Sequence, residues 1–341
     1  LIPEIDVVII NYRPDVPKKL NIDYETLQNF RSDLIYVDNT AFGRKGPNAD
    51  KPGYDIIAQA LSGLMVNEGK YDAVTGTPKN IASTPIADYG TGIAIAWGVC
   101  AALYHREKTG EGQLIESNLL QTALAFQGSH VMDLPAADTL KYERMENVHQ
   151  LQEKGASYPE LIDAHNPLSQ LSEGNIYYRP YSTRDGAIAV GALSSSLWTK
   201  VRTALGTNFL GMADPAFNPQ DSDWVSSARE EVQKIEEHVQ SKTTKEWEKI
   251  FTEHGVPNGA LNFPEDLIDD EQVIQNDGII HLTHDLSGEQ RQVGPLLKMS
   301  KTPLGSNLAS PPLGRDTESI LSNAGYSIEQ IEKLRTNGTI N

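Results

Sequence analysis

Two apolar, β-branched runs near the start of the chain predict buried strands. Residues 6–12 (DVVIINY) and 34–39 (LIYVDN) have the composition of strands that are covered on both faces. Residues 22–30 between them predict a helix, with Asn21 or Asp23 as its N-cap. A strand, a helix and a strand in this order predict a parallel pair joined by a right-handed crossover.

Helical patterns dominate the next part of the chain, and the character changes again after residue 174. In the first half we expect helices at 54–65, 89–106 and 119–130 and a strand at 113–116. In the second half, residues 175–183 and 187–193 flank the turn Arg184-Asp185-Gly186 and predict a hairpin. Helices are expected at 196–205, 227–239, 244–254, 316–323 and 327–336, and short strands at 259–263, 278–283 and 292–297.

These elements predict an α/β fold with two domains. A Rossmann-like large domain with a parallel sheet is expected at residues 1–145. Residues 133–174 lack clear periodicity, so we expect a linker with short helices there, placed at 146–174. A smaller inserted α+β domain is expected at 175–300, and the chain is expected to return to the large domain at 301–341.

Composition excludes several classes of protein. The formal net charge is -17, so a nucleic-acid partner is not expected. No apolar run approaches the ~18–20 residues of a membrane span, so no membrane partner is expected. Cys100 is the single cysteine, which indicates a reducing, cytoplasmic location, and its apolar helical surroundings predict a buried, unreactive thiol. His281 and His284 lack further ligands, and no metal site or permanently bound cofactor is expected.

The segment TPIADYGTG at residues 84–92 is the strongest candidate for chemistry. It places Asp88 just before a long apolar helix, where one interpretation is an N-cap. The other interpretation is a nucleophile, because an ionised carboxylate can attack an activated acyl group. Gly90 and Gly92 leave room for a ligand to approach closely. The two interpretations are compatible.

Seven segments together resemble the class III coenzyme A transferases (CaiB/BaiF type). This group includes the formyl-CoA and carnitine CoA transferases and the α-methylacyl-CoA racemases. The segments are DVVIINYRPDV at 6–16, LIYV with AFGRKGP in the region 34–47, PGYDIIAQALSGLM at 52–65, PIADYGTG at 85–92, ALYHREKTGEGQ at 102–113, GVPNG at 255–259 and PPLGRDTESIL at 311–321. Each is weak alone, but their order and spacing are specific.

The resemblance implies a function and a set of partners. Coenzyme A, as acyl-CoA, would be a substrate together with a carboxylic acid, and Asp88 would be the nucleophile. The intermediates would be an aspartyl anhydride and an aspartyl-CoA thioester. The resemblance also implies an interlocked homodimer in which each chain is a ring threaded by the other.

The resemblance also assigns residues to the CoA site. The pair Asn11 and Tyr12 ends the first strand, and family members bind CoA there and along the next helix. That position carries over to Val16, Lys19 and Leu20. The CoA phosphates need a local basic patch in this acidic chain. The candidates for it are Arg13, Lys18, Lys19, Arg44 and Lys45.

Tyr54 and Asp55 bear on the type of reaction. The racemase branch has a histidine at the position of Tyr54, where it serves as one of two acid/base groups, and the transferase branch has tyrosine followed by an acid. A phenol is poorly suited to that proton exchange near neutral pH. Without the resemblance, Tyr54 is an aromatic residue packed at a helix start. With it, both residues line the substrate site.

The chain also departs from the family. Family members begin with an N-terminal strand–helix–strand unit that contributes to the active site, and we expect this chain to be a fragment that lacks it. The glycine-rich loop of formyl-CoA transferase has no counterpart, and Arg315-Asp316 stands where Glu-His is usual. The alternatives to a transferase are therefore an α-methylacyl-CoA racemase-type isomerase and a catalytically inactive CoA-binding homologue.

Overall fold

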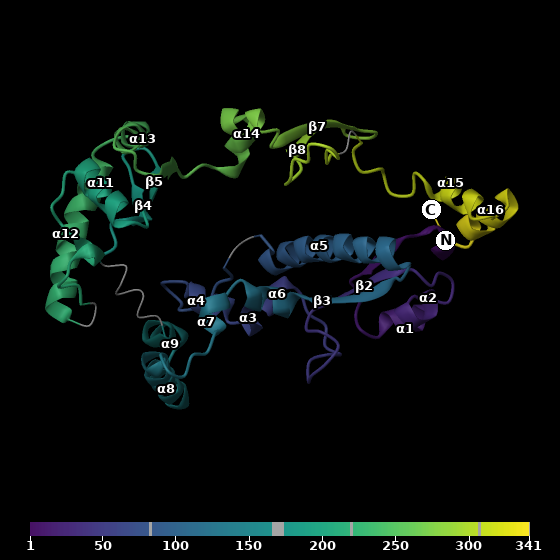
Figure 1. Ribbon diagram of the computed structural model, residues 1–341, viewed down its shortest axis with the longest axis horizontal. Coiled ribbons are helices and arrows are strands. Elements are labelled where there is room, and N and C mark those ends of the chain that lie inside the picture. The colour runs from purple at the N-terminus through teal and green to yellow at the C-terminus, as the bar shows by residue number, and fades with distance from the viewer. Residues whose placement is uncertain (82–83, 166–173, 219–220, 306–307, 341) are drawn as a thin grey trace. The chain divides into compact units, whose positions relative to one another are not determined.

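The computed structural model describes residues 1–81, 84–165, 174–218, 221–305 and 308–340 (Figure 1). The chain groups into two compact units, Leu1–Ser169 and Gln170–Asn341, and each is considered by itself. The finer division into a large domain, a linker, an inserted domain and a C-terminal return stays a prediction.

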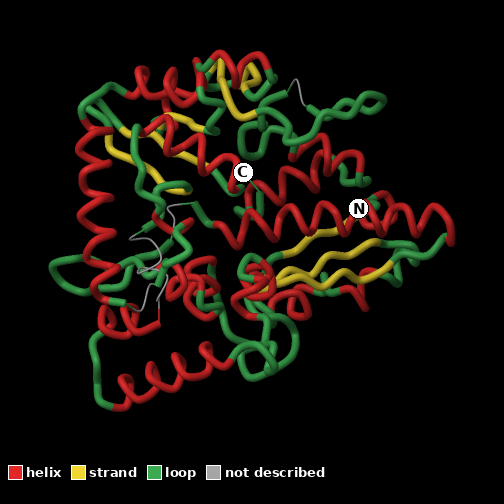
Figure 2. The backbone as a smooth tube through the Cα atoms, turned by 60° about the vertical axis from the view of Figure 1, so that its left-hand side comes forward, coloured by secondary structure: helices red, strands yellow, loops and turns green. Residues whose placement is uncertain are grey.

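A three-stranded parallel sheet forms the centre of the first unit. Strands β1 (Val7–Ile10), β2 (Ile35–Thr40) and β3 (Gln113–Asn118) lie side by side in chain order, and each pair is parallel. The predicted parallel pair is therefore confirmed. Helices α1 (Val16–Leu20) and α2 (Tyr24–Leu27) connect β1 to β2, and α5 (Ile86–Thr109) leads into β3. Figures 1 and 2 show α5 along one face of the sheet, with α1 and α2 on the other side.

Ion pairs tie together the amino ends of the strands and the last turns of α5. Arg31 donates to Asp6 at 2.7 Å and to Asp33 at 3.0 Å. Arg106 of α5 donates to the same carboxylate of Asp6 at 2.9 Å. Both guanidinium side chains are mostly buried, with 19% and 16% exposed. This cluster fixes the last turns of α5 at the amino ends of the strands.

Two predicted helices are each broken into two. The prediction at 54–65 becomes α3 (Asp55–Leu61) and α4 (Leu64–Glu68), because Gly63 adopts a left-handed conformation with φ of 84°. The prediction at 119–130 becomes α6 (Leu119–Ala125) and α7 (Gly128–Val131).

The predicted linker contains two well-formed helices. α8 (Thr139–Glu153) and α9 (Tyr158–His165) pack against each other. The expectation of only short helices is wrong for α8, which has 15 residues. The sequence hides this helix because its few apolar residues are spread among polar ones, so no clear apolar stripe marks it.

Helix α5 leaves a wide apolar surface open. Tyr89, Ile93, Trp97 and Tyr104 are exposed, Trp97 by 78%. Cys100 is exposed as well, so the prediction of a buried thiol is wrong. Contrary to expectation, α5 is also long enough and apolar enough to cross a membrane. Core helices of soluble proteins can have the same length and composition. The other face of α5 packs on β2, β3 and α6.

The second unit begins with an antiparallel sheet covered by helices. Strands β4 (Tyr178–Ser182), β5 (Ala187–Gly191) and β6 (Asn258–Ala260) pair in that order. The predicted hairpin across residues 184–186 is confirmed. Its helices are α11 (Ser195–Leu205), α12 (Ser222–Gln240) and α13 (Thr244–Glu253).

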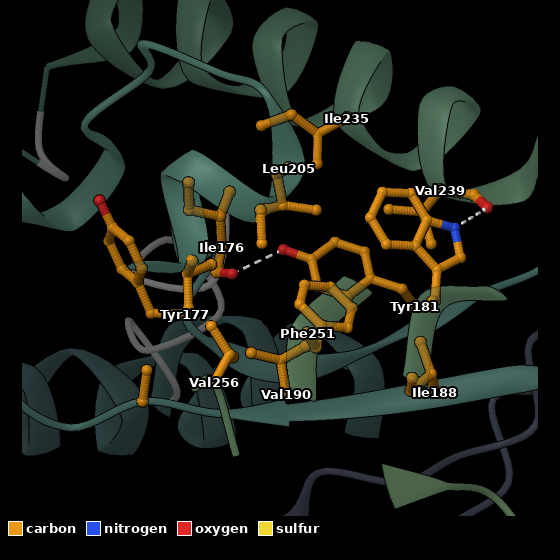
Figure 3. Packing of buried hydrophobic residues seen from close by; sticks show 14 of the residues in the cluster. Ile176, Tyr177, Tyr181, Ile188, Val190, Leu205, Ile235, Val239, Phe251 and Val256 are labelled. Carbon is orange, nitrogen blue, oxygen red and sulfur yellow. Dashed lines mark hydrogen bonds between the residues drawn. The ribbon is translucent and has the colours of Figure 1, made fainter. Parts of the chain in front are cut away.

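Buried aromatic residues form the core between this sheet and its helices (Figure 3). Trp247, Phe251 and Tyr181 are almost fully buried. The polar atoms of the two larger rings are satisfied, because Trp247 donates to the carbonyl of Val239 and Tyr181 donates to that of Ile176, both at 2.7 Å.

The remaining elements of the second unit are smaller. They are two 3₁₀ helices (Gly211–Ala213 and Pro264–Asp269), α14 (Glu271–Gln275), β7 (Ile279–His284), β8 (Gly288–Val293), α15 (Thr317–Asn323) and α16 (Ile328–Thr336); a further 3₁₀ helix, Ile2–Glu4, opens the first unit. The strand expected at 292–297 is largely displaced, because a tight turn after His284 starts β8 at Gly288. The capping box expected at Ser327 and Gln330 is present.

Candidate active site

A pocket of about 810 Å³ lies at the carboxyl ends of β1 and β2 in the first unit. Ligands of open α/β sheets bind at this edge, because the connecting loops diverge there. The lining residues come from the segment after β1, the end of β2, the segment before α3 and the first turns of α5. They are Ile9, Asn11, Tyr12, Arg13, Pro14, Asn39, Thr40, Ala41, Lys51, Pro52, Gly53, Tyr54, Asp88, Gly92, Ile95 and Leu119.

Asp88 lies in the first turn of α5 and opens into this pocket. The helix begins at Ile86, earlier than predicted, and Pro85 is its N-cap. Asp88 is therefore not the capping residue, and that interpretation is wrong. Its side chain is free of a capping role and remains exposed to the pocket.

Asp55 takes over the capping role from the start of α3. Its Oδ1 accepts a hydrogen bond from the backbone nitrogen of Ala87 at 2.6 Å and a longer one from that of Asp88 at 3.3 Å. Its Oδ2 accepts from the side chain of Gln59, whose own carbonyl oxygen accepts from the backbone of Ile81 at 3.3 Å. Asp55 is only 8% exposed and does not line the pocket, so the structure places it behind the wall that carries Asp88.

The surroundings of Asp88 raise the pKa of its carboxyl. Partial burial is the main cause, and the nearby negative charge of Asp55 adds to it. Both effects disfavour the ionised form. Because basicity and nucleophilicity rise together, a carboxylate in this position is a better nucleophile than one in water.

Tyr54 and Asp55 are neighbours in the sequence, but their side chains lie in different environments. Tyr54 is the N-cap residue of α3, 77% exposed, and lines the pocket together with Asp88. The structure thus puts the aromatic residue into the pocket and the acid into the protein. The alternative that Tyr54 is packed in the core is wrong for this chain.

The two predicted site glycines also differ. A Cβ on Gly90 would overlap the ring of Phe126 and lie 2.8 Å from Cγ2 of Thr122, so Gly90 allows α6 to approach α5. A Cβ on Gly92 would meet nothing within 4 Å, and Gly92 lines the pocket. Both lie beyond the first turn of α5, where backbone N–H groups bond within the helix and are not directed at a ligand.

The predicted basic residues are divided in the same way. Arg13 lines the pocket, whereas Arg44 is held by the carboxylate of Asp38, with which it makes two hydrogen bonds of 2.5 and 2.6 Å. Lys19 pairs with Asp15 on α1 and is exposed. Val16, Lys19, Leu20, Arg44 and Lys45 are not among the lining residues, whereas Asn11 and Tyr12 are.

Lys51, Asn39 and Thr40 line the pocket and were not singled out from the sequence. Asn39 and Thr40 end β2, so the rule that ligands bind at the carboxyl ends of parallel strands was the available signal. Lys51 precedes Pro52 and Gly53, and its cation at the pocket offers a second partner for an anion beside Arg13.

Comparisons with known proteins identify the family. The profile of CoA-transferase family III matches residues 1–317, so the chain belongs to that family. A succinate–glutarate CoA-transferase of Agrobacterium fabrum is 30% identical over 349 residues, covering 98% of this chain and 76% of the relative. The succinyl-CoA:glutarate CoA-transferase of Mus musculus is 26% identical over 336 residues, covering 98% and 70%.

Solved structures agree with the fold. A CaiB/BaiF family protein from Brucella suis matches with a TM-score of 0.65 at 23% identity, over 94% of this chain and 76% of that chain. The Rv3272 protein of Mycobacterium tuberculosis gives a TM-score of 0.69 at 18% identity, over 93% and 77%. The predicted family and α/β fold class are confirmed, and the protein is a class III CoA transferase whose substrates are CoA thioesters.

Proposed function

We propose that the protein moves coenzyme A from an acyl-CoA donor to a carboxylic acid, with Asp88 as the covalent nucleophile. The observation that carries the proposal is the exposed carboxylate of Asp88 in the pocket at the sheet's carboxyl edge. Its backbone is anchored by Asp55, so the nucleophile is held in a fixed place without using its own oxygens.

The proposed reaction has two matched halves. The carboxylate of Asp88 attacks the thioester carbonyl, the C–S bond breaks, and an acyl-aspartyl anhydride forms with CoA thiolate. The thiolate then attacks the aspartyl carbonyl and expels the donor acid, which leaves an aspartyl-CoA thioester. An acceptor carboxylate reverses these steps and departs as its CoA ester, so no water is consumed and the thioester's free energy is kept.

Arg13 and Lys51 are suited to hold anionic parts of the substrates. Both line the pocket, in a chain whose net charge is otherwise -17. Charge-assisted hydrogen bonds from such groups to a carboxylate or phosphate are stronger than neutral ones. The relatives named for succinyl-CoA and glutarate make this pair the first donor and acceptor to assay.

Oxygen labelling tests the mechanism directly. In the proposed steps an ¹⁸O atom of the acceptor acid passes to the carboxylate of Asp88 and leaves in the donor acid of the next turnover. Full-length protein should therefore show ¹⁸O in the peptide that contains Asp88 by mass spectrometry after turnover with labelled glutarate. Label that stays in the acceptor, or oxygen that enters from water, would contradict the proposal.

The nucleophile itself is tested by substitution. Asp88→Ala should lower the rate by about 10⁴–10⁶-fold, as expected for loss of a covalent nucleophile. Hydroxylamine added with acyl-CoA should convert Asp88 to a hydroxamate in the wild type only. Undiminished transfer in Asp88→Ala would overturn the assignment.

The CoA-binding role of Lys19 stays a proposal. It rests on the family resemblance and on the exposed side chain of Lys19 on α1, the helix that follows the pocket-lining residues 11–14. Lys19→Ala should raise KM for the CoA ester, more so at low salt, where charge interactions are least screened. Lys154→Ala, which removes a cation just after α8, is the matched control. Equal KM values for both variants at low ionic strength would remove Lys19 from the CoA site.

We also propose that the assembled protein is an interlocked homodimer in the cytoplasm. The exposed apolar side chains of α5, including Trp97 and Tyr89, support a covering partner surface. Sedimentation of the full-length protein should give twice the monomer mass, and a monomer at micromolar concentration would contradict the assembly. Fractionation of cells is the test of location.

A further inference from the structure

A second cavity, of about 640 Å³, lies at the other end of α3 from the Asp88 pocket. Ser62 and Gly63, which follow α3, line this cavity, whereas Tyr54 at the start of α3 lines the first pocket. The two have no lining residue in common. The walls of the second cavity come mainly from α4, α7, α8 and α9, all in the first unit.

One wall of the cavity is apolar. It contains aliphatic side chains from four helices, and Val148 and Ile162 among them are almost fully buried. The apolar lining residues are Val66, Val131, Met145, Val148, Leu161 and Ile162. This surface is suited to a hydrocarbon group of a ligand.

The polar lining contains more basic and titratable nitrogen side chains than acids. The five basic or titratable nitrogen side chains are His130, Lys141, Arg144, His149 and His165, and Asp138 is the only acid among the lining residues. Asp138 is already engaged, because it accepts from the backbone of Leu134 at 2.7 Å and lies 3.7 Å from Lys141. In a chain of net charge -17, such a cluster opposes the overall field.

Two polar atoms of this cluster are buried without a partner. Nε of Arg144 and Nδ1 of His165 are enclosed, and neither makes a hydrogen bond to any part of the chain that the structure describes. Leaving such groups unsatisfied is unfavourable, and more so for a charged group. Over the described ranges, no group of histidines and acids is placed to hold a metal ion. The guanidinium of Arg144 lines the cavity close to His165, and its positive charge suits an anion there.

We propose that this cavity binds a small organic acid, with its carboxylate on Arg144 and His165 and its hydrocarbon part against Val148, Leu161 and their neighbours. A guanidinium suits a carboxylate because its donors match the two oxygens. The site is separate from the Asp88 pocket and does not depend on the transfer reaction.

Proton uptake should accompany binding. Burial lowers the pKa of His165, and the positive charges of Arg144 and His130 lower it further. A bound carboxylate offsets those charges, so it favours the protonated imidazole. Besides His165, the charged or titratable groups that line the cavity are His130, Asp138, Lys141, Arg144, His149 and Tyr158. Affinity should therefore rise as the pH falls from about 8 toward 6, across the ordinary histidine range.

The test is calorimetric titration of the full-length protein with hexanoate, hexan-1-ol and inorganic phosphate at equal ionic strength. Hexanoate should bind. The alcohol lacks the carboxylate and phosphate lacks the hydrocarbon part, so each should bind at least about tenfold more weakly. Contacts from hexanoate to the side chains of Val148 and Leu161, observed by NMR, should locate it. Equal binding of phosphate, or no binding of hexanoate, would overturn the proposal.

Substitutions separate this cavity from the Asp88 pocket. Arg144→Gln should weaken hexanoate binding at least about tenfold, and His165→Gln should remove its pH dependence. Lys154→Gln removes a charge at the C-terminal end of α8, the helix that carries Arg144, but Lys154 does not line the cavity. This variant should leave hexanoate binding unchanged. Thermal unfolding checks that each variant is folded. Unchanged hexanoate affinity in both folded cavity variants would refute the site.

Discussion

Asp55 and Asp88 are 33 positions apart in the sequence, and Oδ1 of Asp55 lies 3.3 Å from the backbone nitrogen of Asp88. The same oxygen accepts from Ala87 at 2.6 Å. One carboxylate therefore fixes the first turn of α5 so that the other can face the pocket. The charge that caps the helix also raises the pKa of Asp88. A single buried side chain thus anchors the proposed nucleophile and adds to the rise in its pKa that burial mainly causes.

Replacement of Asp55 should separate these two effects. Asp55→Ala leaves two backbone donors at the start of α5 without their acceptor and should cost about 1–3 kcal/mol in unfolding free energy. Asp55→Asn keeps an acceptor oxygen, so its loss should be smaller. Because Asn carries no charge, the pKa of Asp88 should fall in that variant, which NMR titration of the carboxyl can detect.

The control for this pair is Asp50→Asn, in the exposed loop before the pocket. It should leave both the unfolding free energy and the titration of Asp88 unchanged. If Asp55→Ala were as stable as the wild type in urea, the capping bonds would contribute nothing to the anchoring of α5.

The sequence predicts the strands and the general place of Asp88 well, for local reasons. Residues 6–12 and 34–39 are continuous β-branched runs, which are typical of strands in parallel sheets. β2 is buried as predicted, whereas the prediction that β1 is covered on both faces is wrong, because Ile9 is 56% exposed. The capping of α5 by Asp55 could not be predicted in this way. It depends on a contact across 33 positions, and neither residue's neighbours in sequence indicate it.

Other details were missed because tertiary packing decides them. The pattern of apolar residues does not mark the break between α3 and α4 at Gly63. It does not mark helix α8 either, because α8 has no clear apolar stripe. Lys51 lines the pocket from the irregular segment before α3, and its local sequence does not mark it as a site residue. The local sequence around Asp88 predicted that Gly90 leaves room for a ligand, whereas its missing side chain serves the contact with Phe126.

The two glycines of α5 provide a matched pair of substitutions. Gly90→Ala should destabilise the protein by about 1–3 kcal/mol, because its methyl group overlaps Phe126. Gly92→Ala should fold normally and gain about 0.5–1 kcal/mol from the better helix former. Its methyl group enters the pocket, however, so transfer activity should fall. Chemical unfolding and steady-state kinetics measure the two effects.

A double variant tests whether the loss of stability in Gly90→Ala comes from its overlap with Phe126. In the double variant Gly90→Ala with Phe126→Leu, the smaller side chain should recover part of the lost stability. If Gly90→Ala were harmless, or if Gly92→Ala were the less stable of the two, the assignment of their roles would be reversed.

Asp88 should reduce the stability of the folded protein at neutral pH. Its pKa is raised above the ordinary 3.8, so the folded state binds the proton more tightly than the unfolded chain does. The associated stability is complete below the unfolded pKa and is lost as the pH rises through the folded pKa. The dipole of α5 favours the charge, but burial and Asp55 outweigh it.

Asp88→Asn should therefore raise Tm at pH 7, and the difference should shrink as the pH falls through the folded-state pKa of the wild-type carboxyl. Asp50→Asn again serves as the control with no expected effect. A lower Tm for Asp88→Asn at pH 7, or a difference that grows on acidification, would show that the charge of Asp88 stabilises the fold.

The last prediction concerns the choice between transfer and racemisation. Moving a proton between the two faces of an α-carbon requires two acid/base groups, one on each face. Asp88 can serve as one, and its raised pKa makes it a better base. The pocket places Tyr54 where the racemase branch has a histidine, and none of the described lining residues is a histidine. A phenol is too weak an acid to exchange its proton as an imidazole does near neutral pH.

Full-length protein incubated with a chiral 2-methylacyl-CoA in D₂O, without an acceptor acid, should therefore show no deuterium at the α-carbon. Addition of glutarate should start CoA transfer in the same tube, which proves that the enzyme is active. Tyr54→His tests the physical reason, because an imidazole at this position supplies the missing acid/base group and should allow slow deuterium exchange. Exchange by the wild type at a catalytic rate, lost in Asp88→Ala, would replace the transferase mechanism with that of a racemase.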